Sequence, residues 1–510
     1  MDLLQNLYTG FSLALSPTNL LFAAIGVIYG TITGALPGIG SATAVALLLP
    51  LTFTMNPTTA LIMLAGIYYG VAYGGTITAV LINVPGDSST VMTTLDGYQM
   101  ALQGRAGPAL SIAAIGSFIA GTISTILLMG LAPPLARFAL RFGPPEYFAL
   151  VLLAFSLLTA FEGRQPVKIV ISTLLGLLIA TIGLDVVSGL PRFTFGVPQL
   201  LGGISFITVI IGLFGIGEVL SSVEQEMRLD FLRQRFRLRD VFPTWADWVA
   251  SRWPILRSTI VGFLVGILPG AGATTASFLA YLSEKRLAKH PERFGRGAIE
   301  GVASPESANN AASIGAFAPL LALGIPGSAT TAVLLAGFMI WGIRPGPMLF
   351  QRNADLVWAL IASMYIGNLM LVLLNIFFIP GFVAVLRIPY TILMPLIVVF
   401  STMGAFTVNN DLFDVWLMIG FGVLGYLMKK LEYPVAPMVL ALVLGPMAEN
   451  SLRQALIISG GSLSIFFTRP ISAVLLGIAF LAYLYPALRW VVRGFRLRVA
   501  TAANLSSARR

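Results

Sequence analysis

GILPGAGATTASF, residues Gly266 to Phe278, is the stretch that decides the fold of this chain. It is apolar on both sides of the pair Pro269-Gly270, and proline and glycine both interrupt helices. In lipid, the carbonyl and N–H groups freed by such an interruption must face protein, water or a ligand. The new helix start over Ala273–Thr275 attracts anions. The stretch therefore predicts part of a binding site for a negatively charged ligand inside a membrane.

The chain contains this interruption twice. Gly34–Ala44 reads GALPGIGSATA and matches Gly266–Ala276, which reads GILPGAGATTA. A second pair of motifs follows, VPGDSSTV from Val84 and IPGSATTA from Ile325, and FSLLTAF and FSTMGAF form a third pair. Because the three matches occur in the same order and at similar spacing, we infer two copies of one ancestral unit.

The composition sets the class of protein. Of the 510 residues, 57% are hydrophobic and 10% are charged, whereas a soluble domain is about 25% charged. Apolar runs of about 20 residues recur, and each is long enough to cross roughly 30 Å of hydrocarbon. The sequence predicts an all-α polytopic membrane protein with roughly ten to thirteen spans or half-spans.

Charge and residue usage exclude several functions. The net charge of +10 comes from lysines and arginines in short loops and at the C-terminus, as in cytoplasmic loops. We therefore expect no nucleic-acid partner. The chain has no cysteine, and its one histidine is His290 in a charged loop. This excludes disulfides and multi-histidine metal sites and disfavours Ser-His-Asp catalysis, so we expect no cofactor and no transition metal.

The domains follow from the repeats and from one polar boundary, residues 221–252. This segment carries a run of arginines followed by tryptophans, which predicts a cytoplasmic linker or an amphipathic helix on the membrane surface. The predicted domains are a first membrane repeat (1–220, hairpin tip at 36–44), the linker (221–252), a second membrane repeat (253–468, hairpin tip at 268–276), and an extra transmembrane helix with a basic cytoplasmic tail (469–510).

The segment Ile255–Leu282 lies between two basic loops, which places both of its ends on the cytoplasmic side. Its two arms are each shorter than a full span, so a re-entrant hairpin with its tip near the bilayer midplane is favoured over two crossings. If the matching hairpin enters from the other face, the two repeats are inverted, as in many secondary transporters. The uncharged flank Thr52–Thr59 agrees with an external base for that hairpin.

We hypothesise that the two tips face each other and hold substrate carboxylates through N–H groups and hydroxyls rather than through arginines. The alternative is that the Pro-Gly pairs are only helix kinks. The candidate substrate-binding residues are Pro37, Gly38, Gly40, Ser41, Thr43, Pro269, Gly270, Gly272, Ala273, Thr274, Thr275, Gly327 and Ser328.

The motif SPESANNAA, Ser304–Ala312, suggests a cation site. Asn309 and Asn310 offer amide oxygens, which suit a small hard cation such as Na⁺, and Glu306 can neutralise a cation or carry a proton. Asp87 is a further candidate for cation binding or coupling. The alternative is an ordinary helix start, with Ser304 as the cap and Pro305 in the first turn. The coupling ion is therefore expected to be Na⁺ or H⁺.

Three further acids occur in or near apolar segments, and intramembrane acids are candidates for functional sites. They are Glu146, Asp185 and Glu218. Each of them can equally lie at a helix end.

Four segments together resemble the large permease subunit of the tripartite tricarboxylate transporters. They are GALPGIGSATAVALLLPLTF, YYGVAYGGTITAVLINVPGD, PESANNAA and LGIPGSATTAVLLAGFMIWGIRPGP. The resemblance covers nearly the whole chain, in the order of the family and at about its length. Asp87 departs from the small residue expected after the Pro-Gly pair, and an acid there would repel a carboxylate unless it is paired or bound to the cation.

The resemblance implies a cation-coupled importer of carboxylates in the bacterial inner membrane, with an elevator-like scaffold and transport domain. It implies two protein partners, a small membrane subunit and a periplasmic solute-binding protein that delivers the substrate. The substrates of the family are citrate, other di- and tricarboxylates and some aromatic acids. From the residues alone, a partner-independent carrier or channel and, more remotely, an intramembrane enzyme remain alternatives.

Overall fold

The structure is a computed structural model that describes residues 3–161, 165–185, 188–224, 241–378, 381–382 and 390–484. Within these residues the chain is mostly helical, and its one sheet is a two-stranded hairpin of β1 and β2. In this part of the chain, seven helices are long and apolar enough to cross a membrane. The all-α polytopic class predicted from composition is therefore confirmed.

The first half contains long helices separated by short interruptions. Its elements are α1 (Leu3–Ala14), α2 (Pro17–Ala35), α3 (Ser41–Leu48), η1 (Pro50–Thr54), α4 (Pro57–Ile82), η2 (Ser88–Thr90), α5 (Val91–Leu102), α6 (Ala106–Ala139), α7 (Pro144–Phe161), α8 (Pro166–Ala180), β1 (Gly183–Leu184), β2 (Pro191–Arg192), η3 (Pro198–Gly202), α9 (Phe206–Ile210), the π-helix η4 (Ile211–Ile216) and α10 (Gly217–Glu224).

The second half shows the same alternation. Its elements are α11 (Trp245–Ile267), α12 (Gly272–Leu287), η6 (Pro291–Arg293), α13 (Glu300–Gly315), α14 (Phe317–Leu323), α15 (Ala329–Ile340), α16 (Leu349–Arg352), α17 (Ala354–Phe377), α19 (Tyr390–Asn409), α20 (Leu412–Lys430), α21 (Val435–Ile458) and α22 (Ile465–Thr468). A shorter apolar helix, Pro470–Leu484, follows.

Helices extend into both ends of the segment 221–252 that was predicted as a linker. α10 reaches Glu224 and α11 begins at Trp245. The earlier start of α11 has a local cause: Thr244 and Asp247 form a reciprocal capping box, which satisfies free N–H groups of the first turn. The central residues of the linker, 225–240, and the basic tail from 485 lie outside the described residues.

The two halves pack their first helices in the same way. On α2, a Cβ added at Gly34 would lie 2.2 Å from the carbonyl oxygen of Val71 on α4. On α11, a Cβ added at Gly266 would lie 2.4 Å from the carbonyl oxygen of Ala312 on α13. Glycine is needed in both places because the two backbones are in contact, as small residues allow in membrane helices. Equivalent motifs thus make equivalent helix contacts.

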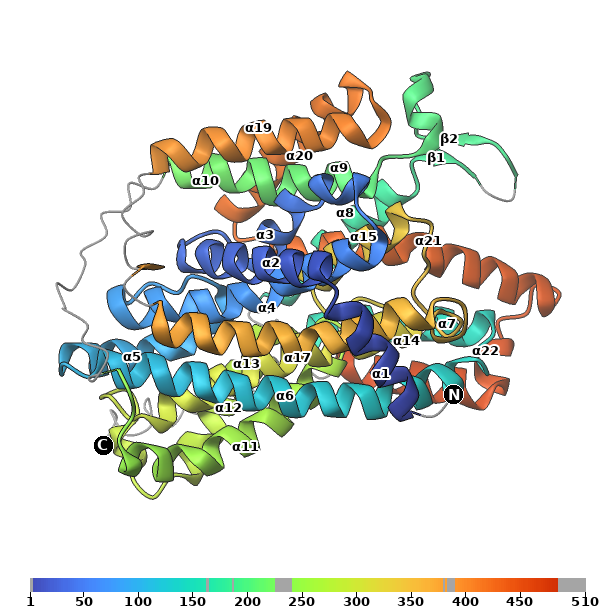
Figure 1. Ribbon diagram of the computed structural model, residues 1–510. Helices are drawn as coiled ribbons and strands as arrows, with labels where there is room; N and C mark the ends of the chain where they lie inside the picture. The colour runs from blue at the N-terminus through green and yellow to red at the C-terminus, as the bar shows by residue number, and fades with distance from the viewer. Residues whose placement is uncertain are drawn as a thin grey trace, which may run out of the picture.

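The core of the molecule surrounds α4. The apolar window of this helix is 100% buried inside the protein, whereas that of α20 is only 28% buried. Figure 1 shows α2, α4, α17 and α6 side by side, and α4 contacts each of the other three. A helix that is apolar all round and covered by protein is a central helix, and helices with exposed apolar faces suit a lipid-facing periphery.

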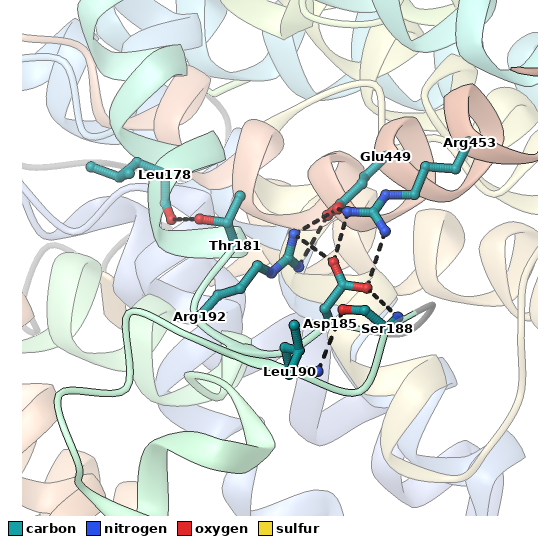
Figure 2. Close-up of polar contacts among 8 residues, drawn as sticks. All are labelled: Leu178, Thr181, Asp185, Ser188, Leu190, Arg192, Glu449 and Arg453. Carbon is teal, nitrogen blue, oxygen red and sulfur yellow. Dashed lines mark hydrogen bonds and ion pairs between the residues drawn. The ribbon is translucent and has the colours of Figure 1, made fainter. Parts of the chain in front are cut away.

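The β1–β2 hairpin lies at the opposite end of the molecule from α5 (Figure 1). Four charged residues join it to α21 (Figure 2). Arg192 lies 2.6 Å from Glu449 and 3.4 Å from Asp185, and Arg453 lies 2.7 Å from each of these two carboxylates. Because each charge has a partner of opposite sign, the hairpin is held to the helix by a balanced network.

Candidate functional site

A cavity of about 1190 Å³ lies between the two hairpin tips. The first tip contributes Gly38–Thr43 without Ile39, and the second contributes Gly270–Thr275. Residues that follow the second Pro-Gly pair of each half, including Asp87 and Ser328, line the same space. All four helix interruptions identified in the sequence therefore contribute residues to one cavity, which polar and apolar side chains line together.

The first tip is formed by the end of α2 and the start of α3. Leu36 leaves the helix in an extended conformation, Gly38 has φ +94°, and α3 begins at Ser41. A positive φ of this kind favours glycine, because a Cβ would be strained. A Cβ at Gly38 would also lie 2.9 Å from a carboxylate oxygen of Glu218. Glu218 therefore sits directly against the first tip.

The second tip is formed by the end of α11 and the start of α12. Gly270 has φ +83° and Gly272 has φ +64°. The Gly270 N–H donates to the carbonyl oxygen of Gly327 at 2.9 Å, which ties this tip to the second interruption of its own half. Leu158 from α7 packs against Gly270, where a Cβ would lie only 2.4 Å from the leucine Cγ. The tip conformation thus depends on glycine at this position.

Two hydroxyl pairs cross between the halves. Ser41 Oγ at the first tip lies 2.8 Å from Thr330 Oγ1, which follows the second interruption of the second half. Ser88 Oγ, which follows the second interruption of the first half, lies 2.8 Å from Thr274 Oγ1 at the second tip. Each tip therefore contacts the second interruption of the other repeat, and both contacts are made through neutral hydroxyl groups.

The structure divides the predicted substrate-binding residues into two groups. Pro37, Pro269 and Gly327 are buried and do not line the cavity. They shape the backbone behind it instead, since the carbonyl oxygen of Gly327 accepts the Gly270 N–H. The predicted residues that line the cavity are Gly38, Gly40, Ser41, Thr43, Gly270, Gly272, Ala273, Thr274, Thr275 and Ser328.

Asp87 caps two helix starts at once. Its Oδ2 accepts the Ser41 N–H at 3.0 Å, and its Oδ1 accepts the Ser89 N–H at 2.9 Å. A carboxylate at a helix start is stabilised by the partial positive charge there. The N–H group of α3 that was expected to hold a substrate carboxylate is therefore occupied by a carboxylate of the chain itself.

Sequence reasoning missed several cavity residues. Ser88, Ser89 and Thr330 follow the second Pro-Gly pairs, so extending the tip argument to these motifs would have found them. Tyr68 has no such signal; its hydroxyl lies 3.4 Å from Ser328 Oγ. Phe214 belongs to the π-helix η4, and its carbonyl oxygen accepts the hydroxyl of Thr43 at 3.4 Å. π-Helical turns are frequent at functional sites.

The predicted cation cluster lies outside the cavity. Glu306, Asn309 and Asn310 are at most 2% exposed and do not line the cavity. Because α13 begins at Glu300, Pro305 lies inside the helix, and the alternative of a helix start at Ser304 is wrong. The packing of α4, α5, α6, α11 and α12 around α13, rather than a local cap, places these polar groups in the interior.

Glu306 accepts hydrogen bonds from three neutral groups. They are the hydroxyl of Thr76 at 2.6 Å, the hydroxyl of Thr93, and Asn309 Nδ2 at 3.2 Å. No ion pair to Glu306 is found among the residues that the structure describes. A buried carboxylate without a counter-ion is costly, so this group suits either a proton or a bound cation.

A small void adjoins this cluster. Its volume is about 10 Å³, and Thr76, Ser117 and Asn375 help to line it. Asn375 Oδ1 is buried and has no hydrogen-bond partner. Ser117 accepts a hydrogen bond from Asn310 Nδ2 at 2.8 Å, which connects the void to the predicted cation ligands. The void itself is lined by the oxygen-bearing side chains of Thr76, Ser117 and Asn375 among mostly apolar side chains, and the predicted cation ligands do not line it. Transition-metal ligands are not grouped: no cluster of three His, Cys, Asp or Glu occurs in the described ranges.

The three other candidate acids have different surroundings. Glu146 lies 3.2 Å from Arg469, and Asp185 belongs to the network of Figure 2. Neither of them lines the cavity. Glu218 does line it, where it pairs with Lys429 at 3.0 Å. The first two acids join elements at the edge of the protein, and only Glu218 belongs to the site.

Fold and site together define a class of protein: a polytopic helical membrane protein whose interrupted helices meet at one cavity, as in secondary transporters. The chain belongs to the tripartite tricarboxylate transporter TctA family, whose family model matches residues 20–440. It is therefore a transporter component and not an enzyme. The resemblance drawn from the sequence motifs is confirmed.

The chain is also similar to uncharacterized proteins. One from Agrobacterium vitis, in the TAR-I ttuC' 3' region, is 47% identical over 478 residues, which cover 94% of this chain and 95% of the relative. A second from the same organism, in the TAR-II ttuC' 3' region, is 49% identical over 217 residues, 42% of this chain and 90% of the relative. A protein of Methanocaldococcus jannaschii is 26% identical over 226 residues, 43% of this chain and 55% of the relative. No solved structure matches the chain.

Proposed function

We propose that this chain imports an organic carboxylate, a di- or tricarboxylate or an aromatic acid, across the bacterial inner membrane and couples this import to a cation. The observation that carries the proposal is the cavity of about 1190 Å³ that both hairpin tips line. Membership of the TctA family supports a carboxylate as the substrate. A carrier with its site between two interrupted repeats fits the general design of secondary transporters.

Neutral hydroxyls would bind the substrate reversibly. Ser41 and Thr43 line the cavity from the first tip, and Thr274 and Thr275 line it from the second. Hydroxyls and helix-start N–H groups donate hydrogen bonds to a carboxylate. Each neutral hydrogen bond contributes only about 1 kcal/mol net. The substrate can therefore be released on the far side of the membrane. The hydroxyl pairs that cross between the halves would exchange their mutual bonds for bonds to substrate.

The cation would balance the substrate charge. Asp87 and Glu218 give the cavity negative charge before any substrate enters, and a carboxylate substrate adds more. We assign the cation, Na⁺ or H⁺, to Glu306, Asn309 and Asn310, with Asp87 as a coupling residue. The buried carboxylate without a counter-ion and the unpartnered Asn375 Oδ1 support this assignment. Cation binding would then favour loading of the anion before the site moves.

The movement would be elevator-like, with one domain carrying the site past a scaffold, and the two repeats would have inverted topology. The matching glycine contacts of α2 with α4 and of α11 with α13 support two equivalent units. We further propose that the linker and the C-terminal tail are cytoplasmic, since their arginines would follow the positive-inside rule.

The proposed partners are a small membrane subunit and a periplasmic solute-binding protein, as the tripartite family implies. The alternative is a carrier or channel that works without them. Uptake of labelled citrate into proteoliposomes, measured with and without the separate binding protein, separates the two. We expect uptake only in its presence, and equal uptake without it would favour the alternative.

The site itself is tested by two substitutions, Thr275→Val and Asn310→Ala. The first removes a cavity hydroxyl with little change of volume, and the second removes an amide beside the buried carboxylate. We expect each to lower citrate uptake about tenfold or more, the effect of losing one buried polar interaction, without changing the amount of protein in the membrane. Thr407→Val on the exposed face of α19 is the matched control. Normal uptake by both site variants would overturn the assignment.

A further inference from the structure

Lys429, in the last turn of α20, lines the cavity and faces Glu218 of α10. Its ammonium lies 3.0 Å from both carboxylate oxygens of Glu218. The lysine side chain is 49% exposed, whereas that of Glu218 is 12% exposed. The carboxylate of Glu218 is therefore sheltered against the first tip, whereas the side chain of Lys429 is about half exposed.

Lys429 is the one basic side chain among the described residues that line the cavity. The other charged residues of that lining are Asp87 and Glu218. For an anionic substrate, the ammonium is thus the one point of direct charge attraction in this lining. An ammonium has three N–H donors, and with two of them directed at Glu218 it retains capacity for a further acceptor.

The location of the pair connects it to the tips. Glu218 is the residue that a Cβ at Gly38 would meet at 2.9 Å, so its carboxylate borders the first tip. The ammonium of Lys429 donates a hydrogen bond to this carboxylate. A substrate held at the tips by one carboxylate could direct another toward Lys429. A substrate with a single carboxylate could make one of these two contacts but not both.

We propose that Lys429 binds a second carboxylate of the substrate, and that Glu218 holds the ammonium in place when no substrate is bound. This rests on the proposed function and deepens it, because it assigns the preference for di- and tricarboxylates to one residue. Glu218 is then an internal competitor for the same ammonium. The opposing explanation is a purely structural ion pair that joins α10 to α20.

The experiment compares uptake of labelled citrate by the full-length protein in proteoliposomes with the binding protein present. Lys429→Gln is expected to raise KM about tenfold, the effect of losing a charge-assisted hydrogen bond, while kcat changes little. Lys429→Arg should keep most of the affinity, because it keeps the charge. Glu218→Gln should lower KM severalfold, because the competitor for the ammonium is weakened.

The double variant Glu218→Gln with Lys429→Gln decides between the two explanations. A structural ion pair predicts that the neutral pair restores the KM of the wild type, which would overturn the proposal. A carboxylate-binding lysine predicts that the double variant stays as poor as Lys429→Gln. Lys430→Gln is the matched control, since this neighbouring lysine does not line the cavity, and its KM should equal that of the wild type.

Failure of the proposed function would look different. Absence of citrate uptake by the wild-type protein, with its binding protein present, would contradict the transport proposal itself. Uptake by the wild type with an unchanged KM in Lys429→Gln would contradict only the role of Lys429. A competition series with unlabelled benzoate, which has one carboxylate, adds a second readout. Lys429→Gln should weaken inhibition by succinate and leave inhibition by benzoate unchanged.

Discussion

The two hairpin tips match in sequence but differ in charge. At the first tip, Ser41 begins α3, and its N–H donates to the carboxylate of Asp87. At the second tip, α12 begins without a side-chain cap, and the residue that corresponds to Asp87 is Ser328. Ser328 caps its own helix, α15, in a reciprocal box with Thr331. One tip therefore carries a fixed negative charge and the other is neutral.

This difference shows that a doubled motif need not give two equivalent binding sites. The carboxylate of Asp87 would repel a substrate anion at the first tip unless a cation lies beside it. The neutral second tip, with Thr274 and Thr275, is then the better place for a substrate carboxylate. We infer that the repeats supply a common framework, and that divergence at this one position makes the two tips differ in charge.

The largest expected effect comes from Gly86 and Gly327, the glycines of the second Pro-Gly pair in each half. A Cβ at Gly86 would lie 1.9 Å from the carbonyl oxygen of Gly34, whereas a Cβ at Gly327 would lie 3.2 Å from that of Gly266. We expect Gly86→Ala to destabilise the protein by about 3 kcal/mol, as strong overpacking does, and Gly327→Ala by about 1 kcal/mol or less. Thermal unfolding in detergent measures both.

The control is Gly130→Ala on α6, where a Cβ would meet nothing within 4 Å. It should unfold at or slightly above the temperature of the wild type, because alanine has the higher helix propensity. Equal losses in Gly86→Ala and Gly327→Ala would mean that the two repeats are packed alike at this point.

A smaller effect tests the charge difference directly. Asp87→Asn keeps a good helix cap but removes the charge, so we expect the Na⁺ concentration for half-maximal uptake to rise about tenfold. Ser328→Ala removes a neutral group, and we expect it to raise the substrate KM about threefold with no change in the Na⁺ requirement. Initial uptake rates at varied Na⁺ and citrate provide both values. If Asp87→Asn changes only the citrate KM, the residue acts on the substrate and not on the cation.

The smallest effect concerns the starts of α2 and α11. α11 begins with the capping box of Thr244 and Asp247, and Arg105 lies 2.5 Å from Asp247, whereas Ser16 before α2 makes no side-chain cap. We expect Asp247→Asn to cost about 1 kcal/mol and Ser16→Ala to cost about 0.5 kcal/mol or less. Unfolding midpoints at neutral pH provide this comparison.

The contacts of Asp247 with Arg105 and Thr244 also make the stability of the protein depend on pH. Burial raises the pKa of Asp247, but hydrogen bonds from Arg105 and Thr244 outweigh it and hold the pKa below its usual value. Its contribution to stability is therefore complete above the unfolded pKa of about 3.9 and is lost as the pH falls through the lower folded value. Asp247→Asn should remove this loss of stability at low pH. If the variant loses stability at low pH as the wild type does, Asp247 is not its source.

Much of the site could be predicted from the sequence, because the signals are local. A Pro-Gly pair inside an apolar run must interrupt a helix, and hydroxyl residues just beyond it lie at the new helix start. This reasoning found Ser41, Thr274 and Thr275, which line the cavity. It included Pro37 and Pro269, which do not, because a motif cannot show which side of the backbone faces the open space.

The sequence by itself determined the membrane class, the doubled interruptions and the family, because hydrophobicity and backbone chemistry act over a few neighbouring residues. Only the tertiary structure decided that Glu306 is interior rather than at a helix end, that Asp87 fills the start of α3, and that Lys429 reaches the cavity. These contacts join residues far apart in the chain. Their existence depends on how helices pack, which no local pattern specifies.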